Sequence, residues 1–206
     1  MNAIRKTMNS DIKSRWEKAQ EWEKAWHGAC INTLGEELKQ LLYAEKMGLY
    51  SYHDGKSPYN FDLGGASVLD IGSGPASLLL KCVNFSYAKV LEPMEMPDWV
   101  LARYEAAGIK FALGKAEAYA DRQVWDEAWI YNVLQHTEDP ELVIMNARRS
   151  AKIIRLFEWI DFPTNEGHLH TLAQGELDKW LCGEGKVEKI DGENECYGTA
   201  YYGIFV

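Results

Sequence analysis

The sequence lacks any long hydrophobic run. No apolar stretch among its 206 residues approaches the roughly 20 residues that a membrane-spanning helix needs. The first residues, Met1 to Lys6, lead into charged, helix-like sequence and not into the apolar core of an export signal. We therefore expect no membrane association and a cytoplasmic location.

Cysteine is also scarce. The four cysteines (Cys30, Cys82, Cys182 and Cys196) form no Cys-x-x-Cys pair and sit in mostly apolar sequence. This pattern favours free thiols over a disulfide framework. We expect reduced thiols with structural roles.

Basic residues are too few for a protein that binds nucleic acid through its phosphates. The chain has 22 Lys and Arg against 31 Asp and Glu, which gives a net charge of −9. The nearest approach to a basic patch is the group Arg148, Arg149, Lys152 and Arg155, which we interpret as the solvated end of a helix. Nucleic acid is thus disfavoured as the main partner.

What the sequence does contain is an alternation of strand and helix patterns after an N-terminal helical segment. Strands are predicted at 67–71, 88–92, 109–113, 126–132, 152–158, 186–191 and 198–206, and helices at 10–28, 75–83, 97–107, 139–149 and 173–181, with a turn at 116–121. A further helix opens with the capping box of Thr33 and Glu36. Such alternation predicts an α/β fold, a mostly parallel sheet with helices on both faces. The last two strands have only the turn 191–194 between them, so they should form a hairpin.

We divide the chain at residue 60. Residues 1–60 are predicted to form a helical cap or lid, whose Trp16, Trp22, Trp26, Tyr43 and Tyr50 are expected mainly in the core, and residues 61–206 the sheet domain. A helical cap over the carboxyl edge of a sheet can exclude water from a substrate.

The segment from Ser67 to Leu80 is the most informative part of the chain. An apolar strand carrying Asp70 enters the turn Gly72-Ser73-Gly74, and a leucine-rich helix is predicted to follow. This order aims backbone N–H groups and a helix N-terminus at a nucleotide-like ligand, and the glycines allow its close approach. Asp70 is expected either to accept from a ligand ammonium group or to fix the loop.

Two further strands end in polar residues suited to such a ligand. Glu92 ends the second strand, about 20 residues after the glycines, where a carboxylate can receive ribose hydroxyls. The segment 114–117 follows the third strand and can bring a polar group to an adenine, and Asn132 emerges after the fourth strand.

These motifs resemble those of the class I S-adenosylmethionine (SAM) dependent methyltransferases, and are similar to the small-molecule branch that includes quinone-biosynthesis enzymes. The first motif is Val68 to Gly74, with Ala76 where a third glycine is common, and the segments 132–140 and 167–172 resemble later parts of the family. The resemblance implies a Rossmann-like seven-stranded sheet of order 3-2-1-4-5-7-6 whose last strand is antiparallel. It also implies SAM as the cofactor, bound by Asp70, Gly72, Gly74, Pro75, Glu92, Ala116, Glu117 and Asn132.

A nicotinamide-dependent Rossmann enzyme is the main competitor for a Gly-x-Gly turn. Three features count against it: the acid within the first strand, Ser77 where the last glycine of the dinucleotide fingerprint belongs, and the terminal hairpin.

Three residues are candidates for catalysis. His136 follows the fourth strand, where the resemblance places it near the cofactor, although a histidine at a helix start can instead bond backbone around the loop. His168 belongs to a His-x-His pair with His170 and could face the substrate, and Glu158 ends the fifth strand. With Glu158 and Asp161 the two histidines also suggest a metal, but the remaining ligands are missing and we predict none.

The sequence therefore predicts a SAM-dependent methyltransferase acting on a small-molecule, glycan or nucleotide-sugar-like acceptor. An RNA or DNA methyltransferase and a non-catalytic SAM-binding partner protein remain as alternatives. The acceptor, the methylated atom and the oligomeric state are left open.

Overall fold

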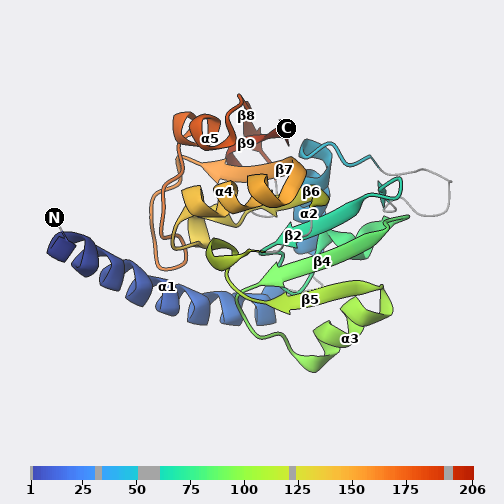
Figure 1. Cartoon of the computed structure of the whole chain (residues 1–206), viewed down its shortest axis with the longest axis horizontal. Coiled ribbons are helices and arrows are strands. Elements are labelled where there is room, and N and C mark those ends of the chain that lie inside the picture. Colours follow the sequence, from blue (N-terminus) through green and yellow to red (C-terminus); the bar gives the residue numbers. More distant parts are fainter. Residues whose placement is uncertain (1, 31–33, 51–60, 121–123, 193–196) are drawn as a thin grey trace.

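The main sheet has seven strands in the order β5-β4-β2-β6-β7-β9-β8 (Figure 1). The computed structural model describes residues 2–30, 34–50, 61–120, 124–192 and 197–206. The strands are β2 (Ser67–Ile71), β4 (Tyr87–Glu92), β5 (Ile109–Leu113), β6 (Trp125–Tyr131), β7 (Ala151–Ile160), β8 (Lys186–Asp191) and β9 (Tyr197–Phe205). Only β9 runs antiparallel to its neighbours. The predicted α/β class, the strand order and the antiparallel last strand are confirmed.

Helices cover both faces of this sheet. On one face, α4 (Pro140–Ser150) and α5 (Gln174–Leu181) enclose a core with alternate strand residues such as Leu69, Ile130 and Leu156. On the other, α2 (Leu34–Lys46) and α3 (Asp98–Ala106) pack with Val68 and Trp129. The two cores separate because successive strand residues point to opposite faces.

The predicted helix at 75–83 is wrong. The chain forms only a 3₁₀ turn, η1 (Leu78–Lys81), and then β3 (Cys82–Val83), which pairs in parallel with β1 (Phe61–Asp62). The sheet face beside this connection is occupied by α2, whose Tyr43, Ala44 and Met47 are buried there. The Gln40 side-chain amide of α2 also donates to the Ala76 carbonyl. A distant helix thus fills the space that a local helix would have taken.

The first helix, α1 (Asn2–Cys30), is longer than predicted. Its N-terminal half projects from the body and its C-terminal half passes the arrowheads of the central strands (Figure 1). Of its predicted apolar face, Ala19 is buried, whereas Trp22 is 43% exposed. Of the other cap aromatics, Tyr43 is buried and Tyr50 is exposed, so the expectation of a cap core holds only in part.

The remaining helices and all seven strands begin and end within two residues of the predicted positions, apart from the turn predicted at 116–121, which is a shorter 3₁₀ turn, η2 (Ala116–Ala118). The Thr33 cap, the connector at 51–60, most of the turn at 191–194 and the side chains of Trp26, Cys30 and Cys196 lie outside the described part. Cys82 and Cys182 are free thiols. Within the described ranges, no helix combines the length and the apolar character needed to cross a bilayer.

Candidate functional site

A cavity lies at the carboxyl ends of β2, β4 and β6, under α1 and α2. The space between these elements amounts to about 1060 Å³ when the part open to solvent is included. The strand side is formed by the loops around Gly72, Glu92 and Asn132, and the helix side includes Trp16, Glu23 and Tyr43. The carboxyl edge of a parallel sheet is where ligands of α/β proteins usually bind.

The glycine turn requires glycine at both predicted positions. Gly72 has φ +69°, and a Cβ there would lie 2.6 Å from Cγ1 of Val133 in the loop after β6. Gly74 has φ +62°, and a Cβ there would lie 3.0 Å from the ring of His27 on α1. Both residues adopt a left-handed conformation that other residues rarely take, and both are closely approached by other segments.

Glu92 links the second strand to this turn. Its Oε2 accepts from the Gly74 N–H at 3.0 Å, and Oε1 accepts from the Met94 N–H at 3.4 Å. The residue is only 3% exposed, and burial raises the pKa of its carboxyl to about 7 against these two hydrogen bonds. Glu92 therefore presents a largely desolvated carboxyl group at the cavity.

Asp70 does not line the cavity, so the expected contact of its carboxyl with a ligand ammonium group is wrong. Its Oδ2 accepts from the hydroxyls of Ser77 and Tyr131, the latter at 2.7 Å. The side chain is fully buried, which raises the pKa of its carboxyl to about 7. Asp70 takes the second role that the sequence allowed, since it fixes the glycine loop from beneath.

Two tyrosines hold the same loop, and the sequence reading missed both. The Tyr104 hydroxyl donates to the Gly74 carbonyl at 2.7 Å and accepts from the Ser77 N–H at 3.2 Å. The Tyr131 hydroxyl accepts from the Leu78 N–H at 3.1 Å. The N–H groups of Ser77 and Leu78 therefore donate to tyrosine hydroxyls, whereas a helix beginning here would have directed such groups at a ligand. In the described structure this turn thus provides no helix N-terminus for ligand binding.

The predicted adenine-side loop lines the cavity with Ala116 and Glu117. Asn146 of α4 holds this loop, because its amide donates to the Ala116 and Glu117 carbonyls at 2.9 and 2.8 Å. Oε1 of Glu117 accepts from the Glu138 N–H at 2.8 Å, which joins the loop to the start of α4. Asn146 had no local signal in the sequence.

The loop after β6 brings Asn132 to the cavity and keeps Glu158 away from it. Asn132 lines the cavity with φ +55°, and its N–H donates to the Phe157 carbonyl at 2.8 Å. Glu158 is fully buried, and its Oε1 accepts from the N–H groups of Val133 and Leu134 at 2.9 and 3.0 Å. Because it points beneath the loop, Glu158 supports the loop backbone and does not occupy the catalytic position expected of it.

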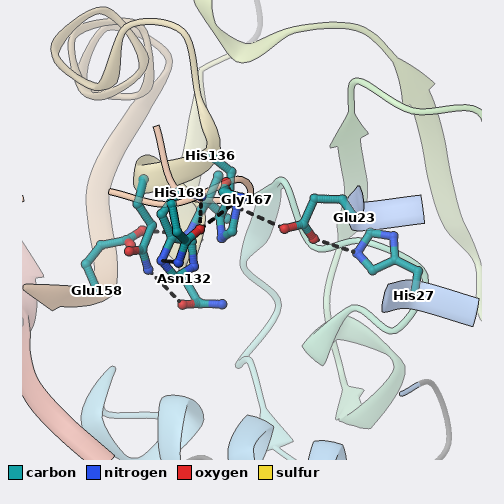
Figure 2. A network of polar contacts seen from close by, with 10 residues as sticks. Glu23, His27, Asn132, His136, Glu158, Gly167 and His168 are labelled. Carbon is teal, nitrogen blue, oxygen red and sulfur yellow. Dashed lines mark hydrogen bonds and ion pairs between the residues drawn. The ribbon is translucent and has the colours of Figure 1, made fainter. Parts of the chain in front are cut away.

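His136 is the one catalytic candidate that lines the cavity. Its Nδ1 lies 2.9 Å from the Gly167 carbonyl and 3.0 Å from Oε1 of Glu23 on α1 (Figure 2). Oε2 of Glu23 lies 3.7 Å from Nε2 of His27. Sequence reasoning missed Glu23, since nothing distinguishes it from the other glutamates of α1.

His168 lies behind His136 and does not line the cavity, contrary to expectation. The two rings meet edge to face with centroids 4.8 Å apart. Burial, together with the nearby His136, lowers the pKa of His168 to about 4. His170 contacts the Thr137 carbonyl through Nε2 at 2.9 Å. No group of three or more His, Cys, Asp or Glu side chains suited to a metal is found in the described ranges.

The side-chain amide oxygens of two glutamines indicate which hydrogen-bonding groups a ligand in the cavity would carry. Oε1 of Gln20 and Oε1 of Gln40 have no hydrogen-bond partner within the described residues, and both glutamines line the cavity. Gln40 donates its amide N–H to the Ala76 carbonyl, so its oxygen is left as an acceptor. Buried acceptors of this kind usually meet a donor, which favours a ligand that carries N–H or O–H groups.

No protein-family model matches the chain, and no curated protein is similar to it in sequence. Solved structures with the same fold are found. A 1,6-didemethyltoxoflavin-N1-methyltransferase from Burkholderia thailandensis, with bound 1,6-didemethyltoxoflavin and S-adenosylhomocysteine (SAH), superposes with a TM-score of 0.59 at 12% identity, over 99% of this chain and 88% of that one.

Two further structures are similar. The N-methyltransferase NodS from Bradyrhizobium japonicum WM9, in complex with SAH, has a TM-score of 0.55 at 14% identity, over 86% of this chain and 89% of that one. The [4+2]-cyclase SpnF has a TM-score of 0.50 at 19% identity, over 71% and 55%. At these identities the likeness establishes the fold, which is that of the class I SAM-dependent methyltransferases.

Proposed function

We propose that this protein is a SAM-dependent methyltransferase that acts on a small molecule. The observation that carries the proposal is that the glycine turn, Glu92, the Ala116–Glu117 loop and Asn132 line one cavity at the carboxyl edge of the sheet. Four segments that the sequence singled out separately for one ligand thus meet at one place.

The chain's residues fit SAM as a ligand. Glu92 would receive the ribose hydroxyls, the turn from Gly72 to Pro75 would border the amino-acid tail, and Ala116 and Glu117 would border the adenine. The unpartnered acceptors of Gln20 and Gln40 suit a ligand whose amino group and ribose are donors. When bound, SAM supplies a methyl group activated by its sulfonium, so the protein's main tasks are alignment and exclusion of water.

A small-molecule acceptor is supported by the cover over the cavity and by the chain's charge. Helices α1 and α2 lie over the strand ends, and Trp16 of α1 borders the cavity with the Lys115 ammonium 3.5 Å from its ring centroid. The acidic chain offers little to a nucleic acid, because Lys152 pairs with Asp126 and Arg155 with Glu127. An RNA or DNA methyltransferase is therefore the weaker alternative, and the quinone-biosynthesis branch and the cytoplasmic location stay predictions.

Isothermal titration with SAH tests the proposal. We expect saturable one-to-one binding, and no heat at high micromolar SAH would refute it. Incubation with methyl-labelled SAM and a metabolite extract, followed by mass spectrometry, then tests transfer. Binding without transfer to any metabolite, with a stable protein partner in pull-downs, would instead support the non-catalytic alternative.

A further inference from the structure

His136 joins the sheet domain to α1 through one ring nitrogen. Nδ1 lies within hydrogen-bond distance of the Gly167 carbonyl and of Oε1 of Glu23 (Figure 2). A carbonyl oxygen and a carboxylate can only accept, so Nδ1 carries a proton in every protonation state of the ring. In the neutral ring the lone pair is therefore on Nε2.

The second ring nitrogen is available to a ligand. His136 borders the cavity, and no side chain or backbone group among the described residues contacts its Nε2 by hydrogen bond or ion pair. The tautomer imposed at Nδ1 thus leaves a basic nitrogen at the edge of the proposed site. The hydrogen bond of Nδ1 goes to the Gly167 carbonyl, while Oε1 of Glu23 lies 3.0 Å from the same nitrogen without a hydrogen bond of its own among the described residues. A carboxylate beside the far nitrogen stabilises the charged form of a general-base histidine.

The charges around His136 favour its role as a base. Glu23 on α1 and Glu158 on β7 both raise the pKa of His136, and the Gly167 carbonyl acts in the same direction against the effect of burial. Two other histidines face it, His27 on α1 and His168 in the loop after β7. The net effect is a pKa above the usual value for histidine.

We propose that Glu23 and His136 form a catalytic dyad in which Nε2 of His136 takes a proton from an aromatic acceptor that bears an acidic O–H or N–H group. Glu23 is the positioning residue, supplied by α1, so the dyad is complete only when α1 lies on the sheet domain. The inference rests on the proposed function and names the acceptor chemistry of the same site.

The acceptor class follows from the strength of the base. An imidazole can take a proton from groups of phenol-like acidity, with a pKa of about 10 or lower, but not usefully from an aliphatic alcohol. The acceptor proton moves to Nε2 while the acceptor lone pair forms the new bond to the methyl carbon. The carbon–sulfur bond electrons stay on sulfur, and the imidazolium later loses its proton to solvent. Aromatic hydroxyl groups and acidic aromatic N–H groups have the required acidity.

The first test measures the histidine itself and needs no acceptor. In ¹⁵N-histidine NMR spectra of the whole protein, we expect His136 to show protonated Nδ1 and to titrate at Nε2. Glu23→Gln should lower the pKa of His136. Glu21→Gln is the matched control, because Glu21 is exposed on the same helix, and it should leave the pKa unchanged. Protonation at Nε2 in the neutral ring would overturn the proposal.

The second test compares pH profiles of methyl transfer. A panel of aromatic hydroxyl and aromatic N–H compounds is offered with SAM, and one arm uses a phenol that is already ionised at assay pH. The rate of transfer to the protonated compounds should rise with pH through the pKa that NMR assigns to His136. In the Glu23→Gln variant this rise in rate should occur at lower pH. His136→Gln should lose about 100-fold with protonated acceptors and little with the ionised phenol.

The failures of the two proposals are distinguishable. If SAH does not bind to the protein, the proposed function is refuted. If SAH binds but His136→Gln transfers methyl groups at the wild-type rate across the pH range, only the dyad falls. No transfer to any aromatic compound of the panel, with SAH binding intact, overturns the acceptor class.

Discussion

The carboxylate of Glu92 accepts a hydrogen bond of 3.0 Å from the backbone N–H of Gly74. This contact joins the end of β4 to the loop that follows β2, across the two strands that pair in register from Ser67 and Tyr87. The group proposed to receive a ribose therefore also sets the shape of the glycine turn. A ligand that uses Glu92 meets a loop already held in place.

Glu92→Ala should weaken SAH binding at least tenfold, which corresponds to about 1.4 kcal/mol. The substitution removes the proposed ribose contact and the support of Gly74 together. Titration calorimetry measures the change, with Glu95→Ala as a control because Glu95 is exposed in the same loop. Unchanged affinity in Glu92→Ala would show that the ribose acid is misplaced.

Gly72→Ala should destabilise the fold by about 2–4 kcal/mol, because it combines a left-handed backbone with overpacking against Val133. Thermal unfolding followed by circular dichroism measures the loss. Gly175→Ala in α5 is the control, since nothing lies within 4 Å of its added Cβ. Equal melting temperatures for the two variants would contradict the observed close approach.

Tyr131→Phe should cost about 1–3 kcal/mol of the free energy of unfolding, because the buried carboxyl group of Asp70 and the Leu78 N–H each lose a partner. Urea titration measures this loss. Tyr87→Phe serves for comparison, since Tyr87 stacks on Trp125 and makes no hydroxyl contact of this kind. A loss no larger than that of Tyr87→Phe would mean that the network carries no net stability.

The stability of the protein should fall as pH rises from about 4 to about 7. Burial raises the pKa of Asp70, Glu92 and Glu158 to about 7, so the folded state keeps protons that the unfolded chain releases near the ordinary carboxyl values. The stability that these three carboxyls contribute is thus lost as pH climbs through this window, and the loss levels off above it. His168, whose pKa is lowered to about 4, opposes the fall in the same window but is one group against three.

Asp70→Asn should reduce the slope of the unfolding free energy against pH by the equivalent of up to about one bound proton. Urea unfolding at a series of pH values measures the slope, with Asp11→Asn as the control because Asp11 is exposed on α1. A slope identical to that of the wild type would show that Asp70 is ionised in the folded state.

Much of the site was accessible from the sequence because motif residues at the ends of parallel strands meet at one edge. Gly72, Gly74, Pro75, Glu92, Ala116, Glu117, Asn132 and His136 were named from motifs and from the family resemblance that the motifs carry, and all line the cavity. Asp70, Glu158 and His168 were named with them, but do not line it. Whether a polar residue near a strand end faces a cavity or a loop backbone depends on what packs beside it, which no local pattern records.

By itself, the sequence determined the seven strands and the glycine turn, because period-two patterns and turn residues act over a few neighbours. The order of the strands was an expectation from the resemblance to the class I SAM-dependent methyltransferases, and the structure has that order. Only the tertiary structure decided that α2 takes the place of the helix expected at 75–83, since that competition is between segments far apart in the chain. It likewise decided that Glu23 meets His136, a contact that exists only because α1 crosses the strand ends. Long-range packing determines which glutamate of α1 contacts His136, and no local sequence pattern distinguishes that glutamate from the others.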